Sequence, residues 1–237
     1  ISPTLFGLYI NDLAKVLNDS GKGIRLNENL TVALLLYADD LAITADSEDN
    51  LQEMLDILEN WCKQWRMRVN VKKTKIVHFR TKTQQRTNFE FIFNNEIVEC
   101  VDKYKYLGII LDEHLDFNTT ASVLANSASR ALGSIYTKFN KLKGLGFSTY
   151  TKIYHSGVTP ILDYCSGVWG YMKFGHIDTV QNRAIRYYLG VHKFAPNLAI
   201  NGDVGWTSSG VRRKVEMLRF WNRLIRMRSE EHTSELQ

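Results

Sequence analysis

The sequence contains few cysteines and histidines and no long apolar run. Its three cysteines are far apart and lack the spacing of a zinc site or a redox pair, which favours a reducing intracellular compartment over secretion. No two of the six histidines stand four residues apart, so each is interpreted as a surface or core residue. No segment is long and apolar enough to cross a bilayer and no secretory signal is recognisable, so no membrane partner is expected.

The composition is typical of a folded protein. The chain has 237 residues, of which 44% are hydrophobic and 11% aromatic, enough for the core of one large domain or two small ones. Charged residues make up 23%, and the sequence shows no internal repeat or low-complexity linker, so disorder is not expected. The net charge of +5 fits a polyanionic partner, although many unrelated proteins share such an excess.

Both ends of the chain are unusual. The sequence has no initiating Met and opens with Ile1-Ser2-Pro3 inside what looks like a motif, so we expect a truncated start. Residues 228–237, RSEEHTSELQ, are polar, lack an apolar period and match the translation of a common sequencing-adapter oligonucleotide. We interpret them as an artefact, with a natural acidic tail as the alternative, and expect the preceding basic helix to end near residue 227.

The first part of the chain mixes helical and strand patterns. Apolar residues at helical spacing predict a helix over residues 4–17, followed by a short polar loop. Two apolar runs around residues 38–40 predict a β-hairpin within 31–45, with an acidic pair at its turn. Continuous hydrophobicity up to Tyr37 predicts burial of the first strand on both faces. Ser47 is expected to cap a second amphipathic helix.

The pattern then changes from strands to helices. Residues 66–79 alternate as a strand or loop-strand, and a polar turn follows. Asn94-Asn95 predicts a hairpin over residues 89–98, and the pattern of residues 104–112 predicts a further strand pair or a strand-turn. After Phe117 helical spacing dominates, with predicted helices over residues 119–143, 147–157, 176–189 and 209–227. The outline is a mixed α/β part followed by an all-helical part.

Asp39 and Asp40 are the strongest chemical signal. Two adjacent carboxylates on a tight turn repel each other, and the arrangement makes sense if cations bind there. Nucleotide addition uses two Mg²⁺ ions about 4 Å apart, and carboxylate oxygens are the hard ligands that Mg²⁺ prefers. The small Ala38 would let a nucleic-acid terminus approach the turn. A solvated turn is the simpler alternative, and the flanking apolar strands argue against it.

Several segments resemble one family in order and spacing. Tyr37-Ala38-Asp39-Asp40 resembles the YADD box of reverse transcriptases. Further segments resemble boxes of the non-LTR retrotransposon enzymes: SPTLF with LYINDL from residue 2, Trp65 with NVKKTK from residue 70, KYLGI with LD from residue 105, TPILDY with VWG from residue 159, and VQNRA from residue 180. The resemblance covers residues 1–227, and a series of boxes is far more specific than YADD alone.

The resemblance implies an α+β fold with three parts. The first is the C-terminal half of a polymerase palm, an antiparallel sheet with packed helices, over residues 1–117. A helical thumb over residues 118–165 and a helical extension over residues 166–227 would follow. The implied activity is RNA-directed DNA polymerisation by two-metal nucleotidyl transfer with Mg²⁺, acting on an RNA template, a DNA primer and dNTPs, in the nucleus or cytoplasm of a eukaryotic host.

The resemblance also assigns catalytic roles. Asp39 would be the main metal ligand, and Asp40 a weaker ligand or an orienter of the first. Lys73 would steady or protonate the leaving pyrophosphate, although a solvated cation in a basic run is an equal alternative. Asn70 and Thr74 are expected to hold the loop of Lys73.

Further residues would contact nucleic acid. The resemblance places Tyr37 under the primer end, while Tyr106, Leu107 and Gly108 would set the primer strand, with Gly108 allowing close backbone approach. Some cations of the helical part should contact phosphates of an RNA–DNA hybrid. Aromatic residues could stack on bases, although aromatic residues at helical spacing more commonly form a core. Those considered are Trp61 in the first part and, in the helical part, Trp169, Trp206, Trp221, Tyr187 and Tyr188.

The family pattern also shows what this sequence lacks. Palms of this type need a further aspartate from an earlier strand, and Asp12 does not match it, since the resemblance puts it on the following helix. The fingers and any endonuclease or ribonuclease H box are also missing, so we expect the chain alone to be inactive. The alternatives are a non-catalytic nucleic-acid-binding remnant of a decayed element, and an unrelated α/β protein with a chance YADD.

Overall fold

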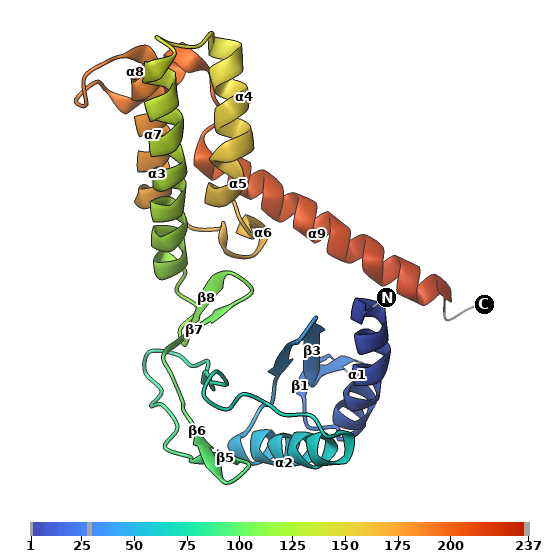
Figure 1. The fold of residues 1–237 in the computed structure, drawn as a ribbon. Helices are drawn as coiled ribbons and strands as arrows, with labels where there is room; N and C mark the ends of the chain where they lie inside the picture. Colours follow the sequence, from blue (N-terminus) through green and yellow to red (C-terminus); the bar gives the residue numbers. More distant parts are fainter. Residues whose placement is uncertain (1, 28–29, 235–237) are drawn as a thin grey trace. The chain divides into compact units, whose positions relative to one another are not determined.

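The structure is a computed structural model that describes residues 2–27 and 30–234, with the side chains of residues 5–27 and 30–226. The chain divides into two compact units, Ile1–Tyr104 and Lys105–Gln237, and each has its own hydrophobic core. Strand pairs and helices alternate in the N-terminal unit, while the C-terminal unit is mainly helical (Figure 1). This mixed architecture with small antiparallel sheets confirms the predicted α/β part followed by a helical part.

Two helices supply most of the core of the N-terminal unit. Helix α1 (Ser2–Asp19) and helix α2 (Glu48–Trp65) pack together through residues that are almost fully buried, among them Leu13, Leu17 and Met54. Helix α2 begins as predicted, because the Ser47 hydroxyl accepts a hydrogen bond from the backbone N–H of Asn50 at 3.3 Å. Both predicted helices are therefore confirmed.

The strands of the N-terminal unit form three antiparallel ribbons. They are β1 (Ile24–Asn27) with β2 (Leu30–Val32), β3 (Leu34–Tyr37) with β4 (Asp40–Ile43), and β5 (Phe91–Phe93) with β6 (Glu96–Val98). The last two confirm the predicted hairpins. Asn94 and Asn95 have φ angles of 51° and 60°, the left-handed conformation that a two-residue hairpin turn requires and that asparagine tolerates well.

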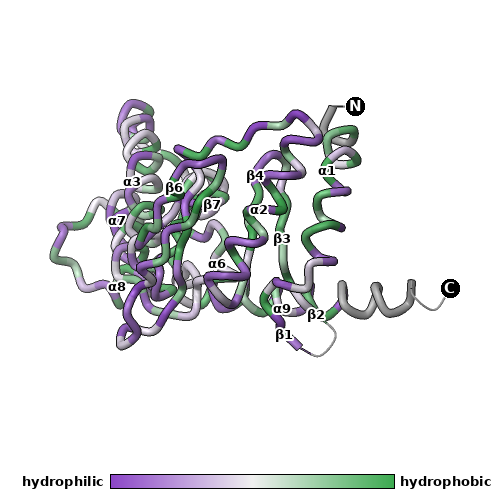
Figure 2. The backbone as a smooth tube through the Cα atoms, turned by 90° about the horizontal axis from the view of Figure 1, so that it is seen from below, coloured by the Kyte–Doolittle hydropathy of each residue, from purple (hydrophilic) through white to green (hydrophobic). Residues whose placement is uncertain are grey.

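Three expectations for this unit were wrong. The ribbon of β1 and β2 falls in the segment predicted as a polar loop, and its residues are mostly exposed. Residues 66–79 form turns and irregular chain with one isolated parallel bridge, Ile76 to Cys100, in place of a strand. Strand β3 is hydrophobic along its length (Figure 2), yet Leu35 remains 52% exposed, because a two-stranded ribbon has only one face on the core.

The C-terminal unit begins with a strand pair and continues as packed helices. Strands β7 (Lys103–Tyr106) and β8 (Ile109–Asp112) confirm the predicted pair. The helices are α3 (Asn118–Lys141), α4 (Phe147–Gly157), α5 (Thr159–Leu162), α6 (Ser166–Trp169), α7 (Gly175–Leu189), α8 (Asn197–Val204) and α9 (Ser209–Ser234). Helix α3 packs on α4, α5 and α7, and fully buried aromatic residues such as Tyr150, Tyr154 and Trp169 fill the core between them.

Glycines bring α6 and α9 close together. A Cβ atom on Gly167 would lie 2.9 Å from the Cβ of Phe220, and one on Gly170 would lie 2.9 Å from the Cβ of Arg213. The guanidinium of Arg213 is almost fully buried and lies over the rings of Trp169 and Phe174, so it is not available to a phosphate. Close packing of α6 on α9 therefore requires glycine, which has no side chain, at positions 167 and 170.

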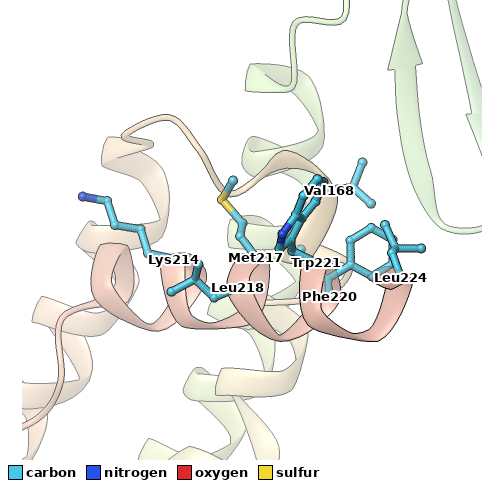
Figure 3. A pocket seen from close by; sticks show the side chains of 8 residues that line it. Val168, Lys214, Met217, Leu218, Phe220, Trp221 and Leu224 are labelled. Carbon is cyan, nitrogen blue, oxygen red and sulfur yellow. The ribbon is translucent and has the colours of Figure 1, made fainter. Parts of the chain in front are cut away.

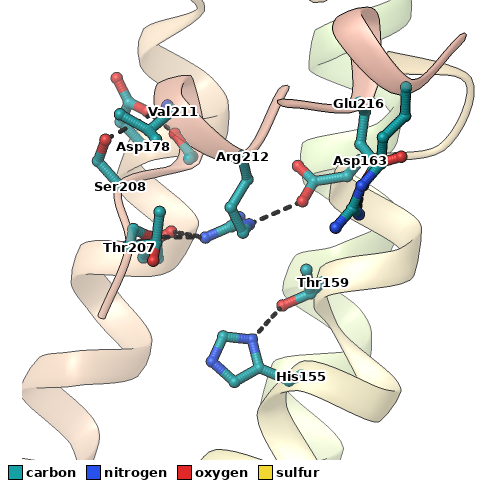
Figure 4. Close-up of polar contacts among 12 residues, drawn as sticks. His155, Thr159, Asp163, Asp178, Thr207, Ser208, Val211, Arg212 and Glu216 are labelled. Carbon is teal, nitrogen blue, oxygen red and sulfur yellow. Dashed lines mark hydrogen bonds and ion pairs between the residues drawn. The ribbon is translucent and has the colours of Figure 1, made fainter. Parts of the chain in front are cut away.

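Arg212 fastens the start of α9 to the helices around it (Figure 4). Its Nε donates to Asp163 Oδ2 at 2.8 Å, and its Nη1 donates to Gln181 Oε1 at 2.6 Å and to the carbonyl of Thr207 at 3.0 Å. Both members of the ion pair are largely buried. Arg212 thus connects three segments that are distant in the sequence.

The long helices of this unit were predicted and the short ones were missed. Helices α5, α6 and α8 lie between the predicted helical ranges, where no helix was expected. Helix α9 continues to Ser234, beyond the predicted end near residue 227. Among the described residues, none of the helices has both the length and the apolar character needed to cross a membrane.

Candidate active site

The acidic residues lie at the tip of the ribbon formed by β3 and β4. The strands pair in register from Leu34 opposite Ile43 to Tyr37 opposite Asp40, so Ala38 and Asp39 form the two-residue loop. Ala38 has a φ of 51°, a left-handed conformation that costs an alanine roughly 1–2 kcal/mol. Such strain is maintained only where the surrounding structure enforces it, and it is common at functional sites.

The base of the ribbon is fixed to the core of its unit. Ala33, directly before β3, is almost fully buried, and its carbonyl accepts a hydrogen bond from the N–H of Thr44 at 2.9 Å. The hydroxyl of Thr44 donates to the carbonyl of Val32 at 2.6 Å, and α1 packs against β3. The loop of Ala38 and Asp39 therefore projects from a firmly held base.

Both carboxylates at the tip face solvent. Asp39 and Asp40 are exposed, and no described lysine, arginine or histidine forms an ion pair with either of them. Tyr37, one residue before the loop, is 64% exposed. Two unpaired, adjacent carboxylates are hard oxygen donors that suit a divalent cation.

The donor set of the tip is only part of a metal site. Among the described side chains of residues 5–27 and 30–226, no three of His, Cys, Asp or Glu come together in a way that could hold a metal ion. Asp39 and Asp40 could therefore supply oxygen ligands on one side of a divalent cation, and further ligands would be needed to complete its coordination.

Lys73 lies on an exposed turn that Asn70 organises. The N–H of Lys73 donates to the carbonyl of Asn70 at 3.0 Å, and the N–H and hydroxyl of Thr74 donate to the same oxygen, each at 3.0 Å. The hydroxyl of Tyr104 donates to the carbonyl of Lys73 at 2.9 Å. The Lys73 ammonium has no ion-pair partner among the described residues, whereas the neighbouring Lys75 pairs with Glu99 at 2.7 Å. Asn70 and Thr74 hold this loop, in agreement with the expectation.

The third predicted segment is the turn between β7 and β8, in the C-terminal unit. Leu107 and Gly108 have φ angles of 45° and 87°, and the hydroxyl of Tyr164 donates to the carbonyl of Leu107 at 3.0 Å. A Cβ atom on Gly108 would lie 3.0 Å from Cε1 of Tyr164. Gly108 thus permits both the turn and close packing of Tyr164, a supporting residue that no sequence pattern connects with this turn.

Comparison with known proteins places these residues in a family. Residues 1–111, which include the acidic loop, Lys73 and the turn of Gly108, match the family described as "Reverse transcriptase (RNA-dependent DNA polymerase)". This segment of the chain is thus similar to reverse transcriptases, and the relatives of the chain are RNA-directed DNA polymerases of mobile elements. The resemblance seen in the sequence is thereby confirmed for the family, while the role of each residue stays a proposal.

The relatives of this chain come from mobile elements. It is 26% identical over 195 residues to "Probable RNA-directed DNA polymerase from transposon BS" of Drosophila melanogaster, which covers 78% of the chain and 21% of that relative. It is 26% identical over 187 residues to "RNA-directed DNA polymerase from mobile element jockey" of Drosophila funebris, covering 76% and 20%. The chain thus spans about a fifth of the length of these relatives, and no solved structure matches it significantly.

Proposed function

We propose that this chain belongs to the polymerase of a transposable element, which copies RNA into DNA with the loop of Ala38 and Asp39 at its catalytic centre. The observation that carries the proposal is the exposed pair of Asp39 and Asp40, which no described cation neutralises, on a strained loop inside the segment that matches reverse transcriptases. The substrates would be an RNA template, a DNA primer and dNTPs.

Two carboxylates on one turn suit the metal chemistry of nucleotide addition. Asp39 would be the principal ligand and Asp40 a second ligand or an orienter of the first. Bound Mg²⁺ would supply a Lewis acid that activates the primer 3′-hydroxyl and neutralises the charge on the leaving pyrophosphate. The protein contributes a firmly based turn, so the carboxylates need little reorganisation when the ions bind.

The remaining site residues have subordinate roles in the proposal. Lys73 would donate a proton or a positive charge to the pyrophosphate, which suits an ammonium that has no described partner. Tyr37 would pack beneath the primer end. Tyr106, Leu107 and Gly108 would set the position of the primer strand. This arrangement corresponds to a palm over residues 1–117, a thumb over residues 118–165 and a helical extension over residues 166–227.

The isolated chain is expected not to polymerise. Two-metal catalysis needs carboxylates on both sides of the ion pair, and Asp39 and Asp40 supply one side. No described acidic, histidine or cysteine side chain joins them to make a group of three. Positioning of the nucleotide supplies much of the rate in phosphoryl transfer, and this chain has no recognisable fingers.

Primer extension on an RNA template tests the proposal. The assay compares this chain, the full-length parent and the parent with Asp39→Asn, each with Mg²⁺ and dNTPs. The parent should extend the primer, the chain should not, and Asp39→Asn should lower the rate about 1000-fold or more, because a charge leaves the metal site. Asp49→Asn, an exposed carboxylate in the first turn of α2, is the matched control and should retain activity.

Two outcomes would contradict the proposal. Full activity of the Asp39→Asn parent would remove this residue from the mechanism. An inactive parent that still binds nucleic acid would favour the non-catalytic remnant. Metal-dependent extension by the chain alone would overturn only the expected inactivity, since a further carboxylate within it would then complete the site.

A further inference from the structure

Helix α9 carries a row of large, exposed apolar side chains. Val211, Leu218 and Ile225 recur at seven-residue spacing, so they lie on one side of the helix, and each is more than half exposed. Every described side chain of α9 after Phe220 is exposed. Because helices in folded proteins are stabilised mainly by packing of their apolar face, this part of α9 lacks the cover that such a helix normally has.

The row borders an apolar hollow between α9 and α6. The hollow has a volume of about 670 Å³ and is lined by Met217, Leu218, Trp221 and Leu224 of α9 and by Gly167 and Val168 of α6 (Figure 3). A hollow of this size accepts several atoms of an apolar ligand or side chain. Contiguous apolar surface that stays exposed commonly marks a place where a protein binds a partner.

The charge around the apolar hollow is positive. Lys214 is the one charged residue among the described residues that line it, and no described carboxylate pairs with its ammonium. The described side chains of α9 include six cations and one carboxylate, Glu216, which Arg219 already engages at 2.6 Å. Arg219 and Arg223 lie in a separate hollow on the other side of Phe220, but they add to a positive potential that salt screens only beyond about 8–10 Å.

Trp221 differs in its surroundings from three other tryptophans of the chain. Trp61, Trp169 and Trp206 are buried in the cores of their units, which settles them as packing residues. Trp221 is 61% exposed and lines the apolar hollow, so its ring can still gain contacts. Tryptophan is among the residues that contribute most to protein–protein binding when a partner covers them.

The apolar row and the positive charge together select the kind of partner. An amphipathic helix can place its apolar face along a hydrophobic groove, and acidic residues beside that face would meet the charge of Lys214. A second copy of α9 would bring the same excess of cations, so repulsion opposes self-association. A nucleic-acid strand would be drawn to the cations and would leave the apolar row uncovered.

We propose that the apolar hollow and the exposed row of α9 bind an acidic amphipathic helix of another protein. Apolar side chains of that helix would pack against Trp221, and a carboxylate would pair with Lys214. The row from Val211 to Ile225 is about 21 Å long, which matches a helix of about four turns. This surface is separate from the acidic loop, and its use does not depend on the polymerase activity.

Binding of a fluorescently labelled peptide to the complete chain, followed by anisotropy, tests the inference. The probe is a peptide of about 15 residues with blocked ends, designed to carry Leu on one helical face and Glu, Ala and Gln elsewhere. A second peptide has the same composition in an order that scatters the leucines, and a third has Lys in place of each Glu. The first peptide should bind about ten-fold or more tightly than the other two, because only it offers both the apolar face and the opposite charge.

Variants of the chain separate the apolar contact from the charged one. Trp221→Ala should weaken binding of the acidic peptide about ten-fold or more, and Trp221→Phe should restore part of the affinity. Lys214→Gln should weaken it about three-fold and reduce its dependence on salt, since an exposed ion pair is lost. These side chains are exposed, so the variants should fold. Matched controls are Leu198→Ala on α8 and Lys152→Gln on α4, both exposed, and neither should change the affinity.

Several results would overturn the inference. They are equal binding of the scattered or the lysine peptide, an affinity that ignores Trp221, and a Kd of the acidic peptide of about 1 mM or weaker. Sedimentation that shows self-association of the chain, lost in the Trp221→Ala variant, would make a second copy the occupant instead. Asp39→Asn should bind the peptide as the unaltered chain does, so failure of the proposed function leaves this test unaffected.

Discussion

His155 lies half-buried in α4, next to the ion pair of Arg212 and Asp163 (Figure 4). Its Nδ1 is 3.1 Å from the hydroxyl of Thr159. Burial lowers the pKa of His155 below its ordinary value of 6.5, and the positive charge of Arg212 lowers it further, while Asp163 acts in the opposite direction. The neutral imidazole is thus the form that the fold accommodates.

A pH dependence of stability follows from this shift. Below pH 6.5 the unfolded chain binds a proton at His155 that the folded chain does not, so the free energy of unfolding should fall as pH decreases toward the folded pKa. Urea unfolding at about pH 7.5 and about pH 5 measures the loss, and His155→Gln should reduce it. His176→Gln, at an exposed position, is the control; an equal reduction there would refute the assignment.

Single residues also show which parts of the site the sequence can reveal. Asp39 and Asp40 are recognisable because an acidic pair between two apolar strands is a local pattern. The positive φ of Ala38 cannot be recognised in the sequence, because alanine has no preference for the left-handed region and only the paired strands impose this conformation. Tyr164 beneath the turn of Gly108 was missed because this contact joins residues far apart in the chain.

At the scale of elements, prediction succeeded where burial imposes a period or a turn needs a special residue. Helix α2 buries a regular apolar stripe, and Asn94-Asn95 fits its turn. The ribbon of β1 and β2 was missed because it is mostly exposed and its sequence carries little burial signal. Helices α5 and α6 have four residues each, too few for a helical period to appear.

The packing of α6 on α9 gives a prediction for Gly170. A methyl group there would lie 2.5 Å from the carbonyl oxygen of Ser166 and 2.9 Å from the Cβ of Arg213, so the helices must shift. Gly170→Ala should lower the free energy of unfolding by about 2 kcal/mol, a typical cost of overpacking. Chemical denaturation measures it.

Gly133 provides the opposite case for comparison. It lies inside α3 with open space where the methyl group of an alanine would extend, so Gly133→Ala should raise the free energy of unfolding by about 0.5–1 kcal/mol through helix propensity. If both substitutions changed stability in the same direction, contact between α6 and α9 would not be the cause.

At the scale of the whole molecule, two separate cores predict two unfolding transitions. Leu132 is fully buried in the core of the C-terminal unit and Met54 in that of the N-terminal unit. Leu132→Ala should move one transition by about 3 kcal/mol, and Met54→Ala should move the other by a similar amount. Denaturant unfolding followed by circular dichroism tests this; one cooperative transition shifted by both variants would contradict it.

Residues 228–237 are expected to contribute nothing to folding or binding. Deleting them should leave the unfolding transitions and the affinity for nucleic acid unchanged within about 0.5 kcal/mol, the usual range for surface changes. The helical segment that they extend begins at Ser209, well before the deletion. A clear loss of stability in the shortened chain would show that this interpretation of the tail is wrong.

The Phe220 ring separates two hollows between α6 and α9, an apolar one lined by Met217, Leu218, Trp221 and Leu224 (Figure 3) and a basic one lined by Arg212, Arg219 and Arg223. Gly167 packs directly against it, and Arg223 lies over it from the basic side. A group that pushes this ring aside in one hollow changes the room in the other, so occupation of the two hollows is thermodynamically linked. Linkage is reciprocal: whatever factor an apolar group beside Trp221 applies to the affinity of an anion beside Arg223, the anion must apply to the affinity of the apolar group.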